Sequence, residues 1–366
     1  MCVRLCVYMC ILLLLWAVLY VWHLLRCVAD RIHVCPNECV TFTGPLADLN
    51  QCPRCHQSRF DSHGRPRRVF LYLPVLQQLR RLFASPDLAE WIRWAGEHKR
   101  TPNTVKDITE SRGWQEHAVN SGNFNEIRNV ALALSTDGFN PFKKSSHSCW
   151  PIMLSVLNFP PHLRTRPDLM ILAGFIPGPR APQNINLYLG ILTSEIVVYG
   201  EPGVYVFDSF KQEDFLLKFF LMQLVADFPA ASKVLCMKGS GALHACHQCS
   251  VKGTKLFREA TTYGDYRRWL PDDHEWRLDT VTFSSVERRQ APREITEKEI
   301  RMFAEAAQEA RDRFDVKSGS VLDPGNNSAV TGWCSLFDLD CFTSRMHGAD
   351  MMHVLVRLIF NCLHRS

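Results

Sequence analysis

The sequence has little net charge, no internal repeat and no low-complexity tract. Its formal net charge is +5 over 366 residues, which permits a nucleic-acid partner but does not require one. Hydrophobic residues make up 46% of the chain and charged residues 22%, a composition that excludes an intrinsically disordered protein. The absence of a repeat argues against an array of small repeated units. The length is sufficient for two or three globular domains.

Cysteine, by contrast, is abundant, and four of the 15 cysteines form two close pairs. Three residues separate Cys35 from Cys39, two separate Cys52 from Cys55, and twelve lie between the pairs. This spacing is typical of a structural zinc site, because paired cysteines on tight turns supply the four thiolates of a tetrahedron. Two disulfides are the alternative. An odd cysteine total fits a reducing compartment with metal sites better than a complete disulfide framework.

An uncharged apolar run covers residues 5–25. A helix needs roughly 20 such residues to cross a bilayer, so the run predicts a transmembrane segment. No small-residue cleavage site follows it, which favours a signal anchor over a cleaved signal peptide. Arg26 and Arg31 against Arg4 favour the C-terminal side inside. The alternatives are a buried helix and an extension that is not part of the functional protein.

Downstream of the cysteines, the pattern predicts two helices that meet near Ser85. Buried strands are expected over 130–134, 151–157 and 169–176, a helix over 184–199, a short strand over 204–207, a strand at the end of the apolar run 215–227, and a helix from 230. An amphipathic helix capped by Thr296 is expected over 295–314. This alternation predicts an α/β fold with a mixed sheet.

Two aspartates occur where predicted strands end. Asp137 follows the strand at 130–134 and precedes a glycine, whereas Asp227 follows the apolar run and precedes Phe-Pro. Carboxylates at the ends of neighbouring strands can hold divalent ions, which activate a water or a 3′-hydroxyl toward a phosphodiester. For each aspartate alone, a turn or cap role is the alternative.

A further close pair, Cys246 and Cys249, follows the second aspartate along the chain. The pair offers two zinc ligands, and His244 and His247 lie beside it. A metal bound there would pin this loop against the core. Two buried thiols are the alternative.

Taken in order, these motifs resemble the Tnp2-type transposase family, the transposases of CACTA (En/Spm-like) DNA transposons and their domesticated relatives. The likeness rests on the first cysteine pairs, FLYLP, LRRLFASPDLAEWIRW, STDGFNPF, DFPAA and HACHQC, which follow one another over about residues 33–253. The segment 350–353, DMMH, resembles a D-x-x-H element further along the family.

The resemblance implies an RNase H-like core that uses three acidic residues with Mg²⁺ or Mn²⁺ for DNA strand cleavage and transfer. Asp137 would be the first acid and Asp227 the second, with Asp208 as the alternative second acid. Cys246 and Cys249 match the C-x-x-C/H motif that follows the second acid. The third acid, a glutamate on a helix, has no assigned position. The resemblance therefore implies a DDE-type transposase without establishing an active enzyme.

The expected plan has five parts. They are a hydrophobic N-terminal helix over 1–30, a zinc-ribbon-like module over 31–62, a helical and basic region over 63–125, an incomplete RNase H-like core over 126–255, and a helical insertion with a truncated C-terminal part over 256–366. By resemblance, the partners are DNA at transposon ends and further copies of the chain, and the location is the nucleus.

Two other functions compete with this interpretation. The unassigned third acid favours a non-catalytic remnant or domesticated protein that binds DNA or protein through its zinc module. The apolar run alone favours a single-pass membrane protein with a zinc-binding domain, anchored through residues 5–25.

Overall fold

The computed structural model describes residues 29–99, 105–142, 147–247, 249–250, 253–255, 261–262, 295–313, 329–340 and 347–348. The chain divides into two compact units. The first contains the residues up to Ala226 together with 338–340 and 347–348, and the second contains the other described residues from Asp227 onward. The predicted transmembrane run at 5–25 lies outside the described residues. Within the described ranges, no helix is long and apolar enough to cross a membrane.

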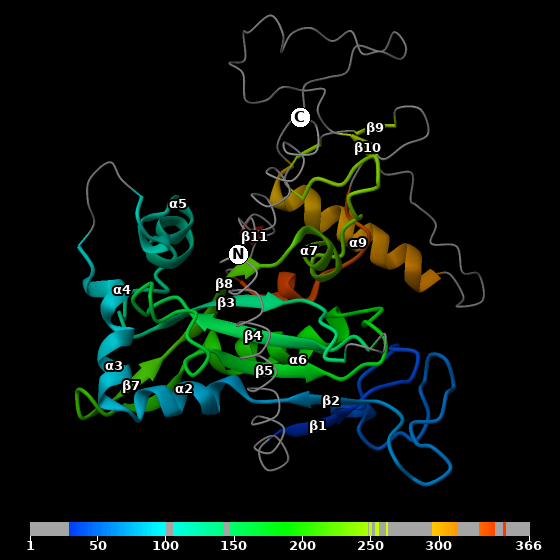
Figure 1. Cartoon of the computed structure of the whole chain (residues 1–366), viewed down its shortest axis with the longest axis horizontal. Coiled ribbons are helices and arrows are strands. Elements are labelled where there is room, and N and C mark those ends of the chain that lie inside the picture. Colours follow the sequence, from blue (N-terminus) through cyan, green and yellow to red (C-terminus); the bar gives the residue numbers. More distant parts are fainter. Residues whose placement is uncertain are drawn as a thin grey trace, which may run out of the picture. The chain divides into compact units, whose positions relative to one another are not determined.

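The first unit is built on a mixed sheet of seven strands, in the order β1–β2–β5–β4–β3–β8–β11 (Figure 1). The strands are β1 (Asp30–His33), β2 (Val69–Tyr72), β3 (Val130–Thr136), β4 (Trp150–Val156), β5 (Ile171–Ile176), β8 (Phe219–Val225) and β11 (His347–Gly348). Neighbours from β1 to β3 pair antiparallel, whereas β8 is parallel to both β3 and β11. The predicted α/β class with a mixed sheet is confirmed.

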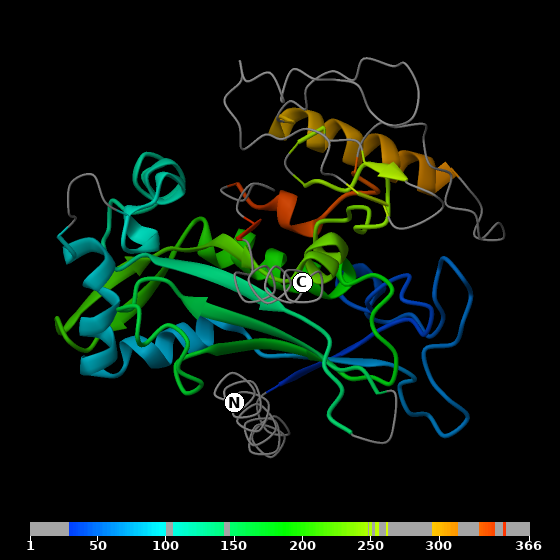
Figure 2. The same cartoon turned by 45° about the horizontal axis from the view of Figure 1, so that its top comes forward.

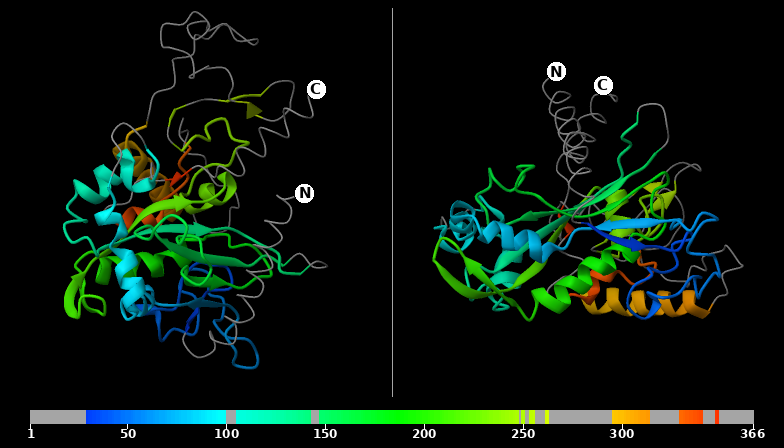
Figure 3. Two further views of the ribbon diagram at one scale, coloured as in Figure 1. Left: turned by 60° about the vertical axis from the view of Figure 1, so that its left-hand side comes forward. Right: turned by 90° about the horizontal axis from the view of Figure 1, so that it is seen from below.

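The strands β3, β4 and β5 form the centre of this sheet and lie side by side in Figure 2. Strands β1 and β2 lie at one edge of the sheet, and the loop that joins them, coloured blue, lies beside this edge in Figure 3. This loop carries all four cysteines of the first cluster. The sheet thus includes β1 and β2, which precede residue 126, the expected first residue of the RNase H-like core. The division of the chain into five parts stays a prediction.

Several helices accompany the sheet in the first unit. They are α2 (Val75–Phe83), α3 (Pro86–Ile92), α4 (Trp94–Glu97), α5 (Arg112–Trp114) and α6 (Asn186–Glu195), with the 3-10 helices η1 (Gly44–Leu46) and η2 (Ile108–Glu110) and the π-helices η3 (Gln115–Val119) and η4 (Ile196–Gly200). Ala84 and Ser85 separate α2 from α3, which begins at Pro86, so the two helices meet near Ser85 as the sequence predicts.

The start of α2 is capped by a residue from another helix. Its own N-cap position is Pro74, which makes no side-chain cap bond. Glu195, the last residue of α6, instead accepts hydrogen bonds from the N–H groups of Val75 at 2.9 Å and Leu76 at 2.8 Å, and from the Tyr72 hydroxyl. A carboxylate at a helix N-terminus satisfies unpaired N–H groups and favours the helix dipole. Glu195 therefore ties α6 to α2.

The apolar run at 215–227 is divided between two sheets. Its first residues belong to β7 (Glu213–Leu217), which pairs with β6 (Val204–Asp208) in a separate two-stranded ribbon. Lys218 forms the junction, since its N–H donates to the Asn129 side chain at 2.9 Å and its carbonyl accepts from Val130 at 2.9 Å. These bonds direct the chain from the ribbon into β8.

The second unit contains α7 (Phe228–Val234), α9 (Glu297–Arg313), η6 (Ser335–Asp338) and the short pair β9 (Thr254–Lys255) and β10 (Thr261–Thr262). Thr296 and Glu299 form a reciprocal capping box at the start of α9, which confirms the predicted cap. Among the α9 side chains that the structure describes, Ile300, Ala304 and Ala307 are buried.

Candidate functional site

The four cysteines of the first cluster come together in the loop between β1 and β2. Their Sγ atoms all lie within 4.8 Å of one another, and those of Cys35 and Cys55 are 3.4 Å apart. A tetrahedral zinc ion with Zn–S bonds of about 2.3 Å holds its sulfur atoms about 3.8 Å apart. The four sulfur atoms therefore fit one zinc ion. Among the residues that the structure describes, this is the only such group of histidine, cysteine or acidic side chains.

Each cysteine pair lies on a tight turn that contains a left-handed residue. Glu38, at φ 53°, donates its N–H to the Cys35 carbonyl at 2.8 Å. His56, at φ 57°, donates its N–H to the Cys52 carbonyl at 2.9 Å. A left-handed residue reverses the chain over a short distance. The two turns thereby bring the sulfur atoms of both pairs to one point.

The thiols of this cluster differ in acidity. Burial and hydrogen bonds to Cys55 and Cys35 raise the pKa of the Cys39 thiol. Burial acts in the same direction on Cys55, but hydrogen bonds from the Gln57 N–H and from the neighbouring thiols lower the pKa of Cys55 to about 7. Zinc binds the thiolate form, and the Cys55 thiol ionises more readily near neutral pH than those of Cys35 and Cys39, whose pKa values are raised.

Glu38 fixes the first cysteine turn to the rest of its unit. Its buried carboxylate pairs with Arg68 at 2.6 Å and accepts the N–H groups of Gln183 at 2.8 Å and Asn184 at 3.0 Å. The Arg68 guanidinium also donates to the Tyr188 hydroxyl of α6 at 2.7 Å. Because these groups are largely buried, the cysteine loop is held against the sheet unit instead of being flexibly tethered.

Arg59 organises the other side of the cysteine loop. Its guanidinium lies over the rings of Phe42 at 4.8 Å and Phe60 at 5.2 Å and donates to the Leu49 carbonyl at 3.1 Å. Its Nε donates to Nδ1 of His33 in β1 at 2.8 Å. Neither Glu38 nor Arg59 was singled out from the sequence, since cysteine spacing carries no information about the residues that position the loop.

Asp137 and Asp227 follow strands that pair in register. Ser135 of β3 lies opposite Val225 of the parallel strand β8, and each aspartate comes two residues later along its own chain segment. Asp137 is exposed at the end of β3. Asp227 caps α7, since its Oδ1 accepts the N–H of Ala230 at 2.8 Å. Among the described residues, no hydrogen bond reaches its other carboxylate oxygen.

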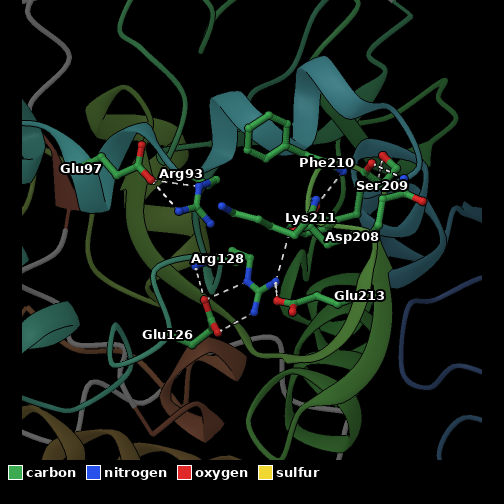
Figure 4. Close-up of polar contacts among 11 residues, drawn as sticks. Arg93, Glu97, Glu126, Arg128, Asp208, Ser209, Phe210, Lys211 and Glu213 are labelled. Atoms are coloured by element: carbon green, nitrogen blue, oxygen red, sulfur yellow. Dashed lines mark hydrogen bonds and ion pairs between the residues drawn. The ribbon is translucent and has the colours of Figure 1, made fainter.

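Asp208, the alternative second acid, has a different environment. It ends β6 in the two-stranded ribbon and is fully buried. Its Oδ1 accepts the N–H groups of Phe210 and Lys211 at 2.9 and 3.1 Å, and its Oδ2 accepts from Arg128 at 3.1 Å (Figure 4). Protein groups thus occupy both oxygens, which favours a structural role for Asp208.

The second cysteine pair lies in the second unit. The Sγ atoms of Cys246 and Cys249 are 3.3 Å apart. Between them in sequence, His247 is buried, stacks on Phe228 with ring centroids 4.5 Å apart, and places Nε2 3.2 Å from the Ser232 hydroxyl of α7. His247 therefore secures this loop to α7, and the two cysteines supply two potential metal ligands.

Gly138, directly after Asp137, allows the Trp150 indole to pack against the chain. A Cβ at this position would lie 2.7 Å from two atoms of that indole, and Trp150 is buried. We expect Gly138→Ala to displace the indole and to lower the free energy of unfolding by about 1–3 kcal/mol, as overpacking of a core does. Urea unfolding measures the loss.

Gly190→Ala is the matched control for this substitution. A Cβ at Gly190 meets nothing within 4 Å, and the residue lies inside α6. Alanine is a better helix former than glycine, so this variant should be as stable as the parent or more stable. Equal stability of Gly138→Ala and Gly190→Ala would contradict the packing argument.

Comparison with known proteins supports a family assignment. A family model described as transposase family tnp2 matches residues 103–306. None of the curated proteins that were compared matches the chain. The matched segment is more than half of the chain and includes both Asp137 and Asp227, whereas the first cysteine cluster precedes it. The chain therefore belongs to transposase family tnp2.

Proposed function

We propose that this chain is a transposase-derived protein with an RNase H-like core, of the type carried by CACTA (En/Spm-like) transposons. Its ancestral activity would be metal-dependent cleavage and transfer of DNA strands. The family membership supports the DNA-directed activity. The sheet supports the core, because three antiparallel strands, β5, β4 and β3, are followed by the parallel strands β8 and β11.

We assign Asp137 and Asp227 as two acids of this core. The observation that carries the assignment is the register of β3 and β8, since Ser135 pairs with Val225 and each aspartate lies two residues after its member of that pair. Carboxylate oxygens are the ligands that Mg²⁺ and Mn²⁺ prefer. Such ions, when bound, activate the attacking water or 3′-hydroxyl and stabilise the leaving oxygen. Asp350, the acid of the D-x-x-H element, lies outside the described residues.

Nicking of supercoiled plasmid DNA in Mg²⁺ or Mn²⁺ tests the assignment. We expect Asp137→Asn and Asp227→Asn each to reduce the nicking rate by about 100-fold or more, because asparagine keeps the shape but loses the charge that binds the ion. Asp48→Asn, at an exposed aspartate of the cysteine loop, is the control and should retain activity. Undiminished nicking by the Asp137→Asn, Asp227→Asn double variant would reject both assignments.

A non-catalytic DNA-binding protein is the second candidate function. The cysteine loop exposes Arg54, Arg65 and Arg67, and Glu38 holds it against the sheet unit. Arginines that contact phosphates give binding that weakens steeply with salt. This function predicts that the chain binds DNA but does not nick it. The DNA binding should survive Asp137→Asn and should be lost when zinc is chelated. Both candidates imply DNA as the partner and the nucleus as the location.

A further inference from the structure

The ribbon formed by β6 and β7 has an outer face that is apolar. Tyr205 is 73% exposed, and it pairs across the ribbon with Leu216, which is also exposed. Phe207, two residues after Tyr205 on the same face, is 49% exposed. In an antiparallel ribbon with one buried face, polar residues normally occupy the outer face. We call Tyr205, Phe207 and Leu216 the ribbon face.

The opposite side of the ribbon is packed against its own unit. Val206, Phe215 and Leu217 are buried there, and the Phe215 ring contacts Phe83 of α2 with centroids 5.0 Å apart. The N–H and the hydroxyl of Ser209 both donate to the Phe83 carbonyl, at 3.0 and 2.7 Å. A one-residue shift in strand register would move the apolar side chains of a strand from the core face to the outer face. Such a shift does not explain the ribbon face, because apolar side chains already fill the core side of the ribbon.

A buried arginine holds the ribbon in place. Arg128 pairs with Asp208 at 3.1 Å and Glu213 at 2.8 Å, which are opposite residues at the turn end, and its guanidinium lies 4.0 Å from the Phe215 ring centroid (Figure 4). Glu126 is a third carboxylate partner of the guanidinium, at 2.9 Å. A ribbon fixed in this way presents its outer face without a large cost in ordering on binding.

Exposed apolar side chains are concentrated in this part of the described structure. Seven of the fourteen large apolar residues that are exposed there lie between residues 197 and 216: Val197, Val198, Tyr199, Tyr205, Phe207, Phe210 and Leu216. Exposed apolar patches on a soluble domain mark interaction surfaces. Tyrosine and phenylalanine are also the residue types that are enriched at protein interfaces.

The charges around the ribbon select the partner. The turn end carries Lys211 and Asp214, and the open end is followed by Lys218 and preceded by Glu201. Each end thus holds one basic and one acidic residue. With no excess of basic residues at either end, the ribbon offers little attraction to a phosphate backbone or an anionic lipid surface.

We propose that the ribbon face is a two-fold interface through which two copies of this chain associate. When two ribbons stack face to face in opposite directions, the turn end of one meets the open end of the other. Lys211 of each copy then faces Glu201 of its partner, and Asp214 faces Lys218, so that opposite charges meet at both ends. The apolar side chains of the two ribbons are buried between them.

The interface is small, which sets its strength. Strands of five residues are about 17 Å long, so the contact is at the lower end of the range for specific interfaces. We therefore expect a reversible dimer with a dissociation constant on the order of micromolar. The pairing makes no use of Asp137 or Asp227, and it is independent of the proposed nuclease activity.

Sedimentation equilibrium of the full chain over about 1–100 µM tests the proposal, since this range brackets the expected dissociation constant. The parent should pass from monomer to dimer, and Tyr205→Lys with Leu216→Lys should remain monomeric with an unchanged urea midpoint. Val119→Lys, at an apolar residue that is similarly exposed on η3, should dimerise like the parent. A monomeric parent throughout the range, or a dimeric double variant, would overturn the proposal.

Exchanging the charges of two residues in the same chain distinguishes self-association from binding to a different partner. Lys211→Glu should weaken the dimer at least several-fold, because it places two acidic residues against each other. Combining it with Glu201→Lys should restore the affinity, since a two-fold axis brings both changes to the same contact. Failure of the double exchange to restore the dimer would exclude the antiparallel arrangement.

Discussion

Cys52→Ser is expected to remove one zinc ion per chain and to destabilise the sheet unit. A serine hydroxyl does not replace a thiolate on zinc, and zinc binding supplies about 10–16 kcal/mol in isolated zinc-finger peptides. Cys52 is fully buried within the cluster. Because its cluster is joined to the sheet unit through Glu38, the damage extends beyond the loop. We expect Cys52→Ser to lower the free energy of unfolding by about 3 kcal/mol, which corresponds to a fall in Tm of roughly 6–12 °C.

Metal analysis after dialysis and thermal unfolding measure the two effects of Cys52→Ser. The zinc content of the variant has to be compared with that of the parent, because Cys246 and Cys249 offer ligands for a second ion. Cys149→Ser makes the same chemical change at a buried cysteine outside the cluster, and it should leave the zinc content unchanged. A Cys52→Ser protein with the zinc content of the parent would refute the four-cysteine site.

Arg128→Met should be the most damaging single substitution outside the cysteine cluster. The variant leaves the fully buried Asp208 without its cation and also deprives Glu126 and Glu213 of theirs. Removing one partner of a buried ion pair typically costs 3–5 kcal/mol, because the remaining charge stays desolvated. We expect a loss of about 4 kcal/mol in urea unfolding at pH 7.

The matched control for Arg128→Met is Arg112→Met. Arg112 is 90% exposed on its side chain and pairs with Glu116 one helical turn away. Exposed pairs of this kind contribute about 0.3–0.5 kcal/mol. The contrast between the two variants tests burial, since each removes one arginine from a carboxylate. Similar losses in both would show that the network around Arg128 contributes no more than a surface pair.

The pH dependence of unfolding gives a second readout for Arg128. Hydrogen bonds from Arg128 lower the pKa of Glu126 below its ordinary 4.5, although burial opposes the shift. A lowered folded-state pKa stabilises the protein above the unfolded-state value and loses that effect as the pH falls through the folded value. The stability gap between the parent and Arg128→Met should therefore be largest at neutral pH and should narrow below about pH 4.5.

The features that the sequence predicts correctly are local ones. The two cysteine pairs converge because each pair is closed by its own short turn, at Glu38 and His56. The strands β3, β4 and β5 are continuous apolar segments with breaks at both ends, and the capping box of α9 involves residues only three positions apart. Spacing alone carries such information.

The features that the sequence does not reveal depend on residues far apart in the chain. The cap that Glu195 provides for α2 spans more than 100 positions, and so do the bonds from Gln183 and Asn184 to Glu38. The division of the apolar run at Lys218 depends on Asn129, which no periodicity indicates. The buried partner of Asp208, the alternative second acid, is Arg128, which precedes it by 80 positions.

The placement of the cysteine loop between two paired strands has an evolutionary consequence. His33 at the end of β1 lies directly opposite Val69 at the start of β2, so the loop leaves and re-enters the sheet at neighbouring points. An insertion whose ends are this close can lengthen, shrink or be exchanged with little cost in loop-closure entropy, while the two strands keep their register. The sheet edge can thus act as an acceptor for interchangeable recognition modules, of which the four-cysteine loop is one.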